Sequence, residues 1–375
     1  MNKKCTLLIT HSCNLNCVYC YEHNKSNASM TLMTACGIVE HELETLDNSK
    51  YDMIDFHFHG GEPLINFKLI HDLCEWVWSK SWNQSFHFYV ITNGTLLNTT
   101  MQKWFEFNKD KITVDISVDG INSVQKANRG CTVHELPIEW VHQCWPNSRF
   151  KMTISKKSLH EFANGVIGLV CKGYDVSSTL AIGEKWSEAD ILEYYKQWDK
   201  LINHYLYNGP IWKQLLKSID PLFNESPIQD KCCNSGDNAI TYDINGERYP
   251  CVIFTPLVAG KDMRKEFVKI DFSNPSMFAD PECSDCFIRN MCKTCYGFNL
   301  LQRGNIATRD KTACSMIRIE INAICLFQGL LLRNTAIKRE LTEIEIQRLN
   351  RANTAFMATK LQNYHYSNGI EDLLL

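Results

Sequence analysis

The chain has 375 residues, of which 45% are hydrophobic and 22% are charged, and its formal net charge is −3. These values are ordinary for a globular protein of about two domains with a sizeable core. There is no basic excess to indicate nucleic acid or an anionic membrane surface as a partner. No apolar run approaches the ~20 residues of a membrane-spanning helix.

Cysteine is the unusual part of the composition, with 18 residues in the chain. In a reducing compartment, such a count indicates metal or redox chemistry rather than disulfides. The apolar stretch at the N-terminus is too short for a secretory signal. We therefore expect a buried first strand and a cytoplasmic protein.

Residues 1–207 alternate short β-rich runs with longer helical patterns. The expected strands are Thr6–Thr10, Met53–His59, Phe86–Thr92, Ile112–Val118, Phe150–Ile154 and Val176–Ile182. Helices are expected near residues 31–46, 66–80, 98–109, 136–144, 159–172 and 187–206. The alternation predicts an α/β fold with a parallel sheet. Six units are too few for a complete eight-stranded barrel, so we expect a partial (β/α)6 TIM-like barrel.

The alternation stops after residue 207. We expect a linker over residues 208–225 and a small cysteine-rich domain over residues 226–314. This domain has few long apolar runs, so something other than a hydrophobic core must stabilise it. Within it, two β-rich runs flank Asn245-Gly246, the strongest short signal for a hairpin. Residues 315–375 are expected to form C-terminal helices and a polar tail.

Three cysteines follow the first expected strand: Cys13, Cys17 and Cys20, spaced Cys-x3-Cys-x2-Cys. Three thiolates can hold three irons of a four-iron, four-sulfur cube, whose usual complement is four cysteines. One iron then stays open to a ligand that is not protein, which distinguishes a catalytic metal site from a closed one. A zinc site completed by His11 is the alternative, although zinc sites usually pair cysteines as Cys-x2-Cys.

This spacing resembles the signature of the radical S-adenosylmethionine (SAM) enzymes. The resemblance implies that the open iron binds SAM and that reduction of the sulfonium releases a 5′-deoxyadenosyl radical. Gly60-Gly61-Glu62-Pro63, after the second strand, resembles the family's motif for the amino group of SAM. Glycines allow close backbone approach, and a carboxylate accepts hydrogen bonds from an ammonium group. Read alone, the same residues are a strand-to-helix turn.

Two later strands end in segments that also resemble the family. Thr92-Asn93-Gly94 resembles its third-strand segment, and Ser117-Val118-Asp119-Gly120 with Asn128-Arg129-Gly130 resembles its fourth. The resemblance implies that Ser117 and Arg129 contact the ribose and carboxylate of SAM and that Tyr19 lies near the adenine. Because the carboxyl ends of parallel strands share one rim, these groups should meet there. The predicted SAM-binding residues are Tyr19, Gly60, Gly61, Glu62, Asn93, Ser117 and Arg129.

The second cysteine group resembles the SPASM extension of radical enzymes that act on peptides and proteins, which holds two auxiliary four-iron clusters. The implied ligands are Cys283, Cys286, Cys292 and Cys314 for the outer cluster, and Cys233, Cys251 and Cys295 for the inner one. Only two residues separate Cys292 from Cys295, where the family has three. Cys232 precedes Cys233, so the inner cluster either uses Cys232 as a fourth ligand or keeps an open iron. A pair of zinc sites is the alternative.

His57 and His59 alternate with Phe56 and Phe58 in the second expected strand. One pair should face the barrel interior and the other the helices. We interpret the histidines as buried and hydrogen-bonded rather than as the catalytic base, which the sequence does not identify.

The resemblance as a whole predicts a radical SAM enzyme that abstracts hydrogen from a residue of a ribosomally made precursor peptide. The expected product is a thioether or carbon–carbon, cyclophane-type cross-link, with the substrate electron passing to the inner auxiliary cluster. Its partners would be a one-electron donor of the flavodoxin or ferredoxin type and a separate leader-recognition protein or surface.

Two alternatives remain from the sequence. A formylglycine-forming sulfatase maturase has an aspartate directly after the cysteine equivalent to Cys251, where this chain has Val252. A non-catalytic iron–sulfur electron carrier or a zinc-stapled binding module predicts no cleavage of SAM.

Overall fold

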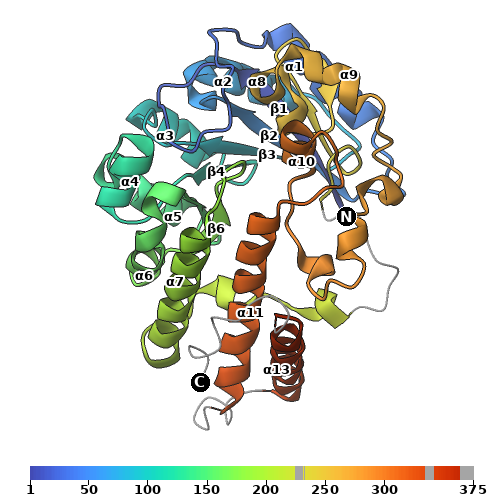
Figure 1. Cartoon of the computed structure of the whole chain (residues 1–375). Helices are drawn as coiled ribbons and strands as arrows, with labels where there is room; N and C mark the ends of the chain where they lie inside the picture. The colour runs from blue at the N-terminus through green and yellow to red at the C-terminus, as the bar shows by residue number, and fades with distance from the viewer. Residues whose placement is uncertain (224–230, 232, 334–341, 364–375) are drawn as a thin grey trace.

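A partial barrel of six strands forms the N-terminal part of the molecule (Figure 1). The computed structural model describes residues 1–223, 231, 233–333 and 342–363. Four strands pair in parallel in the order β4-β3-β2-β1, and β5 and β6 form a second parallel pair. A bridge between Ser117 and Lys151 joins the two sheets. The strands are β1 (Asn2–Thr10), β2 (Met53–Gly60), β3 (Phe86–Thr92), β4 (Ile112–Ile116), β5 (Phe150–Ile154) and β6 (Val176–Leu180). The predicted fold class is confirmed.

Helices connect the strands and cover the outer face of the barrel (Figure 1). They are α1 (Leu32–Glu44), α2 (Phe67–Trp78), α3 (Thr99–Phe107), α4 (Asn122–Arg129), α5 (Ile138–Cys144), α6 (Phe162–Val170) and α7 (Glu188–Tyr207). The sequence pattern did not predict α4, which is short and polar.

Strand alternation separates two faces of the sheet. Phe56 and Phe58 of β2 are fully buried and stack on Phe88 of β3, with ring centroids 5.5 and 5.4 Å apart. They belong to the core between sheet and helices. His57 and His59 alternate with them and therefore lie on the inner face of the barrel.

The predicted hairpin forms and joins the barrel sheet. β7 (Ala239–Tyr242) pairs antiparallel with β8 (Arg248–Tyr249) around a turn in which Gly246 has φ +80°. β7 also pairs in parallel with β1, with Lys4 opposite Ala239 and Thr6 opposite Thr241. One sheet thus spans residues on both sides of the predicted linker. The predicted domain boundaries stay a prediction.

The remaining helices are α8 (Pro256–Ala259), α9 (Arg264–Phe267), α10 (Tyr296–Arg303), α11 (Lys311–Arg333) and α13 (Glu343–Asn363). The long helix α11 packs against α7 and α13 (Figure 1). By length and composition, its segment Lys311–Leu332 could span a membrane, which we did not expect from the sequence. Because 61% of its most apolar window is buried within the protein, it has the character of a core helix.

Candidate functional site

The first cysteine group lies on the loop that follows β1. The Cys20 N–H donates a hydrogen bond of 3.1 Å to the carbonyl oxygen of Cys17. The Cys17 thiol interacts electrostatically with both Cys20 and Cys13. Burial raises the pKa of Cys17 to about 11, and the neighbouring Arg129 opposes this rise. Three half-buried thiols therefore converge at the carboxyl end of the sheet.

His11 is engaged away from these cysteines. Its Nε2 lies 2.6 Å from the Asp243 Oδ1, and both side chains are buried. Asp243 directly follows β7, so this contact ties the start of the cysteine loop to the hairpin. The zinc alternative needed His11 as a ligand, and the structure gives His11 another partner.

Gly60 and Gly61 let the ends of β1 and β2 approach closely. A Cβ atom on Gly61 would lie 2.3 Å from the Ser12 carbonyl oxygen, and one on Gly60 would lie 2.2 Å from the Thr10 carbonyl oxygen. The Gly61 N–H donates to the Thr10 carbonyl at 3.1 Å, and the Glu62 N–H donates to the Ser12 carbonyl at 2.8 Å. Here the glycines accommodate the backbone of the cysteine loop.

Gly61→Ala should therefore displace the cysteine loop, because the new methyl group meets backbone that cannot rotate away. We expect the variant to lose about one cluster, roughly four irons per chain after reconstitution, measured by iron assay. Gly37→Ala is the matched control, because nothing lies within 4 Å of a Cβ there. Equal iron contents in the two variants would contradict this prediction.

Glu62 is buried and holds the strand ends together. Its Oε1 accepts hydrogen bonds from the Leu64 N–H at 3.0 Å and the Thr92 hydroxyl at 2.6 Å. Its Oε2 accepts one from the Asn93 N–H at 2.8 Å. Burial raises the pKa of the carboxyl, and these donors oppose the rise. A carboxylate has about four acceptor positions, so one position remains for an ammonium group.

Asn93 connects the end of β3 to the cysteine loop. Its Nδ2 donates to the Asn14 Oδ1 at 2.9 Å, and its Oδ1 accepts from the Thr95 N–H at 3.0 Å. The Asn14 Nδ2 donates in turn to the Thr95 hydroxyl at 2.8 Å. This closed network orients the loop between Cys13 and Cys17.

Asp119, just after β4, is the centre of the most extensive polar network in the site. Arg129 donates to it through Nε at 3.0 Å and Nη2 at 3.1 Å, and the Tyr19 hydroxyl donates at 2.6 Å. The Asn128 Nδ2 and the Thr153 N–H donate to it as well. The Arg129 guanidinium also lies 5.4 Å from the centre of the Tyr19 ring.

This network changes the interpretation of Arg129. The resemblance implies that Arg129 contacts the carboxylate of SAM, and in the structure its carboxylate partner is Asp119. Within the described part of the chain, Arg129 Nη1 forms no hydrogen bond, so one edge of the guanidinium remains for a second carboxylate. Tyr19 and Arg129 thus lie beside the cysteine loop in one assembly held by Asp119.

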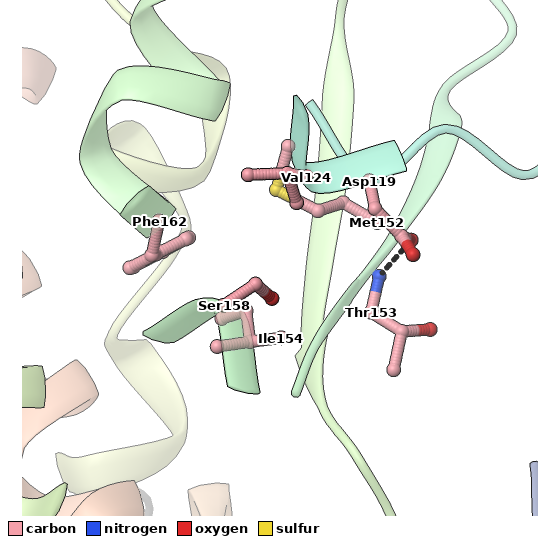
Figure 2. A pocket seen from close by; sticks show the side chains of 7 residues that line it. All are labelled: Asp119, Val124, Met152, Thr153, Ile154, Ser158 and Phe162. Atoms are coloured by element: carbon pink, nitrogen blue, oxygen red, sulfur yellow. Dashed lines mark hydrogen bonds between the residues drawn. The ribbon is translucent and has the colours of Figure 1, made fainter. Parts of the chain in front are cut away.

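A small pocket opens beside Asp119 at the ends of β4 and β5 (Figure 2). Figure 2 shows the hydrogen bond from the Thr153 N–H to Asp119 at its edge, with Val124, Met152 and Phe162 as apolar lining. Ser117 lies nearby at the end of β4, and within the described residues its hydroxyl has no hydrogen-bond partner.

Glu22, directly after the cysteine loop, is a buried acid that the sequence analysis missed. Burial raises the pKa of its carboxyl to about 8, and Glu62 adds to the rise. Its Oε1 lies 3.7 Å from the His59 Nδ1.

The described cysteines of the second group fall into two sets. Cys295 interacts electrostatically with Cys251 and Cys233, and burial raises its pKa to about 12. Cys314 interacts with Cys283 and Cys286, and burial raises its pKa to about 11. These sets follow the division into inner and outer ligands implied by the resemblance. Cys292 lies in the same region, and Cys232 lies outside the described residues.

Hydrogen-bond donors surround these sulfurs. Backbone N–H groups of Ile253 and Phe254 donate to Cys251, and those of Gly297 and Phe298 donate to Cys295. Arg318 Nη2 lies 3.7 Å from the Cys286 sulfur. Such donors stabilise thiolates, the form that binds iron. The donor set fits iron–sulfur ligation, and the assignment of individual ligands stays a prediction.

Within residues 1–223, 231, 233–333 and 342–358, no three His, Cys, Asp or Glu side chains are gathered closely enough for one metal ion.

Tyr21 connects the two cysteine regions and was also missed. It interacts electrostatically with Cys20 on one side and with Cys251 and Cys295 on the other. Its ring packs edge-on against Phe298, with centroids 6.3 Å apart. Its position next to Cys20 could be read from the sequence, whereas its proximity to Cys251 depends on the hairpin joining β1.

His57 is held neutral on the inner face of the barrel, where burial lowers its pKa to about 2. The folded state resists protonation that the unfolded chain accepts near pH 6.5. Stability is therefore present above that pH and is lost as the pH falls. Because the unfolded chain takes up this proton, we expect the free energy of unfolding to fall by about 2 kcal/mol on account of His57 as the pH is lowered from 7.5 to 5.

His57→Phe should remove this contribution, so its free energy of unfolding in urea should fall by about 2 kcal/mol less than that of the parent over this pH range. His134→Phe, at an exposed position, is the control. Parallel pH profiles for parent and His57→Phe would show that His57 is not the group concerned.

Comparison with known proteins places these features in a family. Residues 7–143 match the model of the Radical SAM superfamily. An uncharacterised protein of Methanocaldococcus jannaschii is 30% identical over 66% of this chain and 84% of its own length. The radical SAM cyclopropyl synthase TigE of Paramaledivibacter caminithermalis is 22% identical over 86% of this chain and 74% of its own length.

The fold is shared with a solved structure, anSMEcpe with bound AdoMet and the Kp18Cys peptide. The TM-score is 0.64 at 17% identity, over 90% of this chain and 100% of the other. At that identity the likeness concerns the fold, and it extends beyond the barrel into the cysteine-rich part. Together with the matched family model, the relatives and the cysteine loop after β1, it shows that the chain is an enzyme of the radical SAM superfamily, whose cofactors are SAM and an iron–sulfur cluster.

Proposed function

We propose that this protein modifies peptides and forms a thioether or carbon–carbon cross-link within a ribosomally made precursor peptide. The observation that carries the proposal is the pair of thiol sets in residues 233–314, packed beside the barrel and divided as in SPASM-type peptide enzymes. The similarity to a cyclopropyl synthase and to a fold neighbour solved with a bound peptide supports it.

In this proposal, Cys13, Cys17 and Cys20 hold the cluster that binds SAM. When bound, the reduced cluster supplies the electron that cleaves SAM into methionine and a 5′-deoxyadenosyl radical. The chain's own residues bind and orient SAM. Glu62 would accept from its amino group beside the Asn93 N–H, and Arg129 would donate to its carboxylate through Nη1, which is unbonded within the described residues.

Of the remaining predicted SAM-binding residues, some position the cysteine loop and others would contact SAM. Gly60, Gly61 and Asn93 fix the cysteine loop. The Ser117 hydroxyl, unbonded within the described residues, would contact the ribose, and Tyr19 lies where the cysteine loop meets Asp119. We assign these roles from the contacts that each residue makes.

The proposal includes two auxiliary four-iron clusters, and therefore three clusters in all. Cys283, Cys286, Cys292 and Cys314 would hold the outer one, and Cys233, Cys251 and Cys295 the inner one. Tyr21 and Cys251 place the inner set next to the barrel, in reach of an electron from a substrate radical. A one-electron donor of the flavodoxin or ferredoxin type would reduce the SAM-binding cluster, and a separate protein or another surface of this chain would recognise the leader. We expect the reaction to take place in the cytoplasm.

Formylglycine formation is the rival function. It needs a base at the position of Val252, which is apolar and begins a short 3-10 helix (Val252–Phe254). An apolar residue there cannot accept a proton, which favours the cross-link.

The test is anaerobic incubation of the reconstituted enzyme with SAM, dithionite and short peptides encoded beside its gene. We expect a peptide product lighter by two hydrogen atoms, with fragment ions missing across the cross-linked segment. A product in which a cysteine thiol has become an aldehyde oxygen would establish the rival function instead.

A further inference from the structure

The inner face of β1 and β2 carries polar groups that the site described above does not use. Lys4 and Asp55 are cross-strand partners, and His57 follows Asp55 on the same face. Their neighbours Cys5 and Phe56 point to the opposite face and are fully buried in the core. We call Lys4, Asp55 and His57 the inner-face triad.

Each member of this triad has an unsatisfied polar atom. Within the described residues, Lys4 Nζ forms no hydrogen bond or ion pair, although Asp55 stands opposite it in the register. Asp55 Oδ1 and His57 Nδ1 are buried and have no hydrogen-bond partner in the part of the chain that the structure describes. The other carboxylate oxygen of Asp55 accepts from the Asn2 Nδ2 at 3.1 Å. Buried polar atoms are usually paired, so the two buried unpaired atoms of Asp55 and His57, next to the exposed Lys4 ammonium, indicate a ligand on this face.

The charges around the triad balance. Lys151 and Asp115, further along the same face, already pair at 3.3 Å. Asp55 is then the carboxylate opposite Lys4 in the strand register, and His57 is neutral and stacks on Tyr89 with centroids 4.7 Å apart. A carboxylate ligand would be attracted by Lys4 and repelled by Asp55. An ammonium ligand would be attracted by Asp55 and repelled by Lys4. A neutral ligand with both an acceptor and donors fits all three atoms.

We propose that the inner-face triad binds the side-chain carboxamide of an asparagine or glutamine in the substrate peptide. The amide oxygen accepts from Lys4 Nζ, and the two amide hydrogens are donated to Asp55 Oδ1 and His57 Nδ1. This inference rests on the proposed peptide substrate and names a specificity-determining feature of it.

The position of the triad suits that role. Lys4 lies within electrostatic range of Cys251, and β1 leads from Lys4 to the cysteine loop at its other end. A peptide anchored at Lys4 would therefore lie inside the barrel, between the inner cysteine set and the SAM site. The proximity to Cys251 also suggests another role for Lys4, pairing with the charge of an inner cluster, and the experiment separates the two.

The test measures binding without turnover. The reconstituted full chain, with SAM and without reductant, is titrated with the capped peptides Gly-Gly-X-Gly-Gly, where X is Asn, Gln, Asp, Lys or Leu. We expect the Asn or Gln peptide to bind about tenfold more tightly than the other three, the gain from roughly two net hydrogen bonds. Equal affinities for all five peptides would overturn the proposal.

Two substitutions should change which of the five peptides binds most tightly, without abolishing peptide binding. Asp55→Asn removes the repulsion and should favour the Asp peptide, while Lys4→Gln should favour the Lys peptide. Lys50→Gln, an exposed lysine paired with Asp237, is the matched control and should keep the parental order. If Lys4→Gln keeps the parental order and only shifts the reduction potential of an auxiliary cluster, Lys4 serves the cluster and the proposal fails.

These outcomes are separable from those of the proposed function. Peptide selectivity is read from binding alone, whereas the proposed function is read from peptide products after reduction. Selective binding without any product would leave the triad assignment standing and remove the cross-linking function.

Discussion

Replacing Asp119 with alanine is expected to lower the free energy of unfolding by about 3–5 kcal/mol. The variant would leave the buried Arg129 guanidinium without its charge partner, and the Tyr19 hydroxyl and the Thr153 N–H without their acceptor. Breaking one side of a buried pair costs more than the pair itself contributes, because the remaining charge stays desolvated. Urea denaturation of the protein before reconstitution measures this effect.

Asp72→Ala is the matched control, since Asp72 pairs with the exposed Lys68 one helical turn away. Exposed pairs of this kind contribute little, so we expect almost no change. Asp119→Asn keeps the shape and removes the charge, and it should fall between parent and alanine. If Asp119→Ala and Asp72→Ala unfold at the same urea concentration, Asp119 does not organise the site.

Cys17→Ser should reduce the iron bound after anaerobic reconstitution by about four atoms per chain, roughly a third of the total expected for three clusters. The same variant should form no 5′-deoxyadenosine, because no cluster remains to deliver an electron to SAM. The auxiliary sets are separate groups of thiols, so their iron should remain. Iron assays and chromatography of the reaction mixture measure the two effects independently.

Cys171→Ser controls for the loss of a thiol, because Cys171 is exposed and belongs to none of the three cysteine groups. It should keep the iron content and the SAM cleavage of the parent. Cys17→Ser protein that cleaves SAM like Cys171→Ser protein would remove Cys17 from the catalytic cluster.

The periodic parts of the fold could be predicted from the sequence. Strands β3 and β5 match the predicted ranges, and the Asn245-Gly246 turn joins two strands as expected. Helix α4 was missed because Asn122–Arg129 contains Val124 and Ala127 as its only apolar residues, too few for a helical stripe. The pairing of β7 with β1 was missed because a contact across more than 230 residues leaves no local pattern.

The sequence predicts those site residues that belong to a spaced motif or lie at the end of an expected strand. Cys13, Cys17 and Cys20 converge, and Glu62 and Asn93 lie at neighbouring strand ends. The role of Asp119 was not visible, because a single acid in Ser-Val-Asp-Gly does not reveal that five donors will meet on it. The raised pKa of Glu22 arises from burial in the assembled fold, which the sequence around the residue does not show.

The most direct test of the whole account is the reductive cleavage of SAM by the full chain. After anaerobic reconstitution with iron and sulfide, the protein should bind close to twelve irons and, with dithionite and SAM, release 5′-deoxyadenosine and methionine in equal amounts. A reconstituted protein that binds zinc in preference to iron and releases no 5′-deoxyadenosine would contradict it.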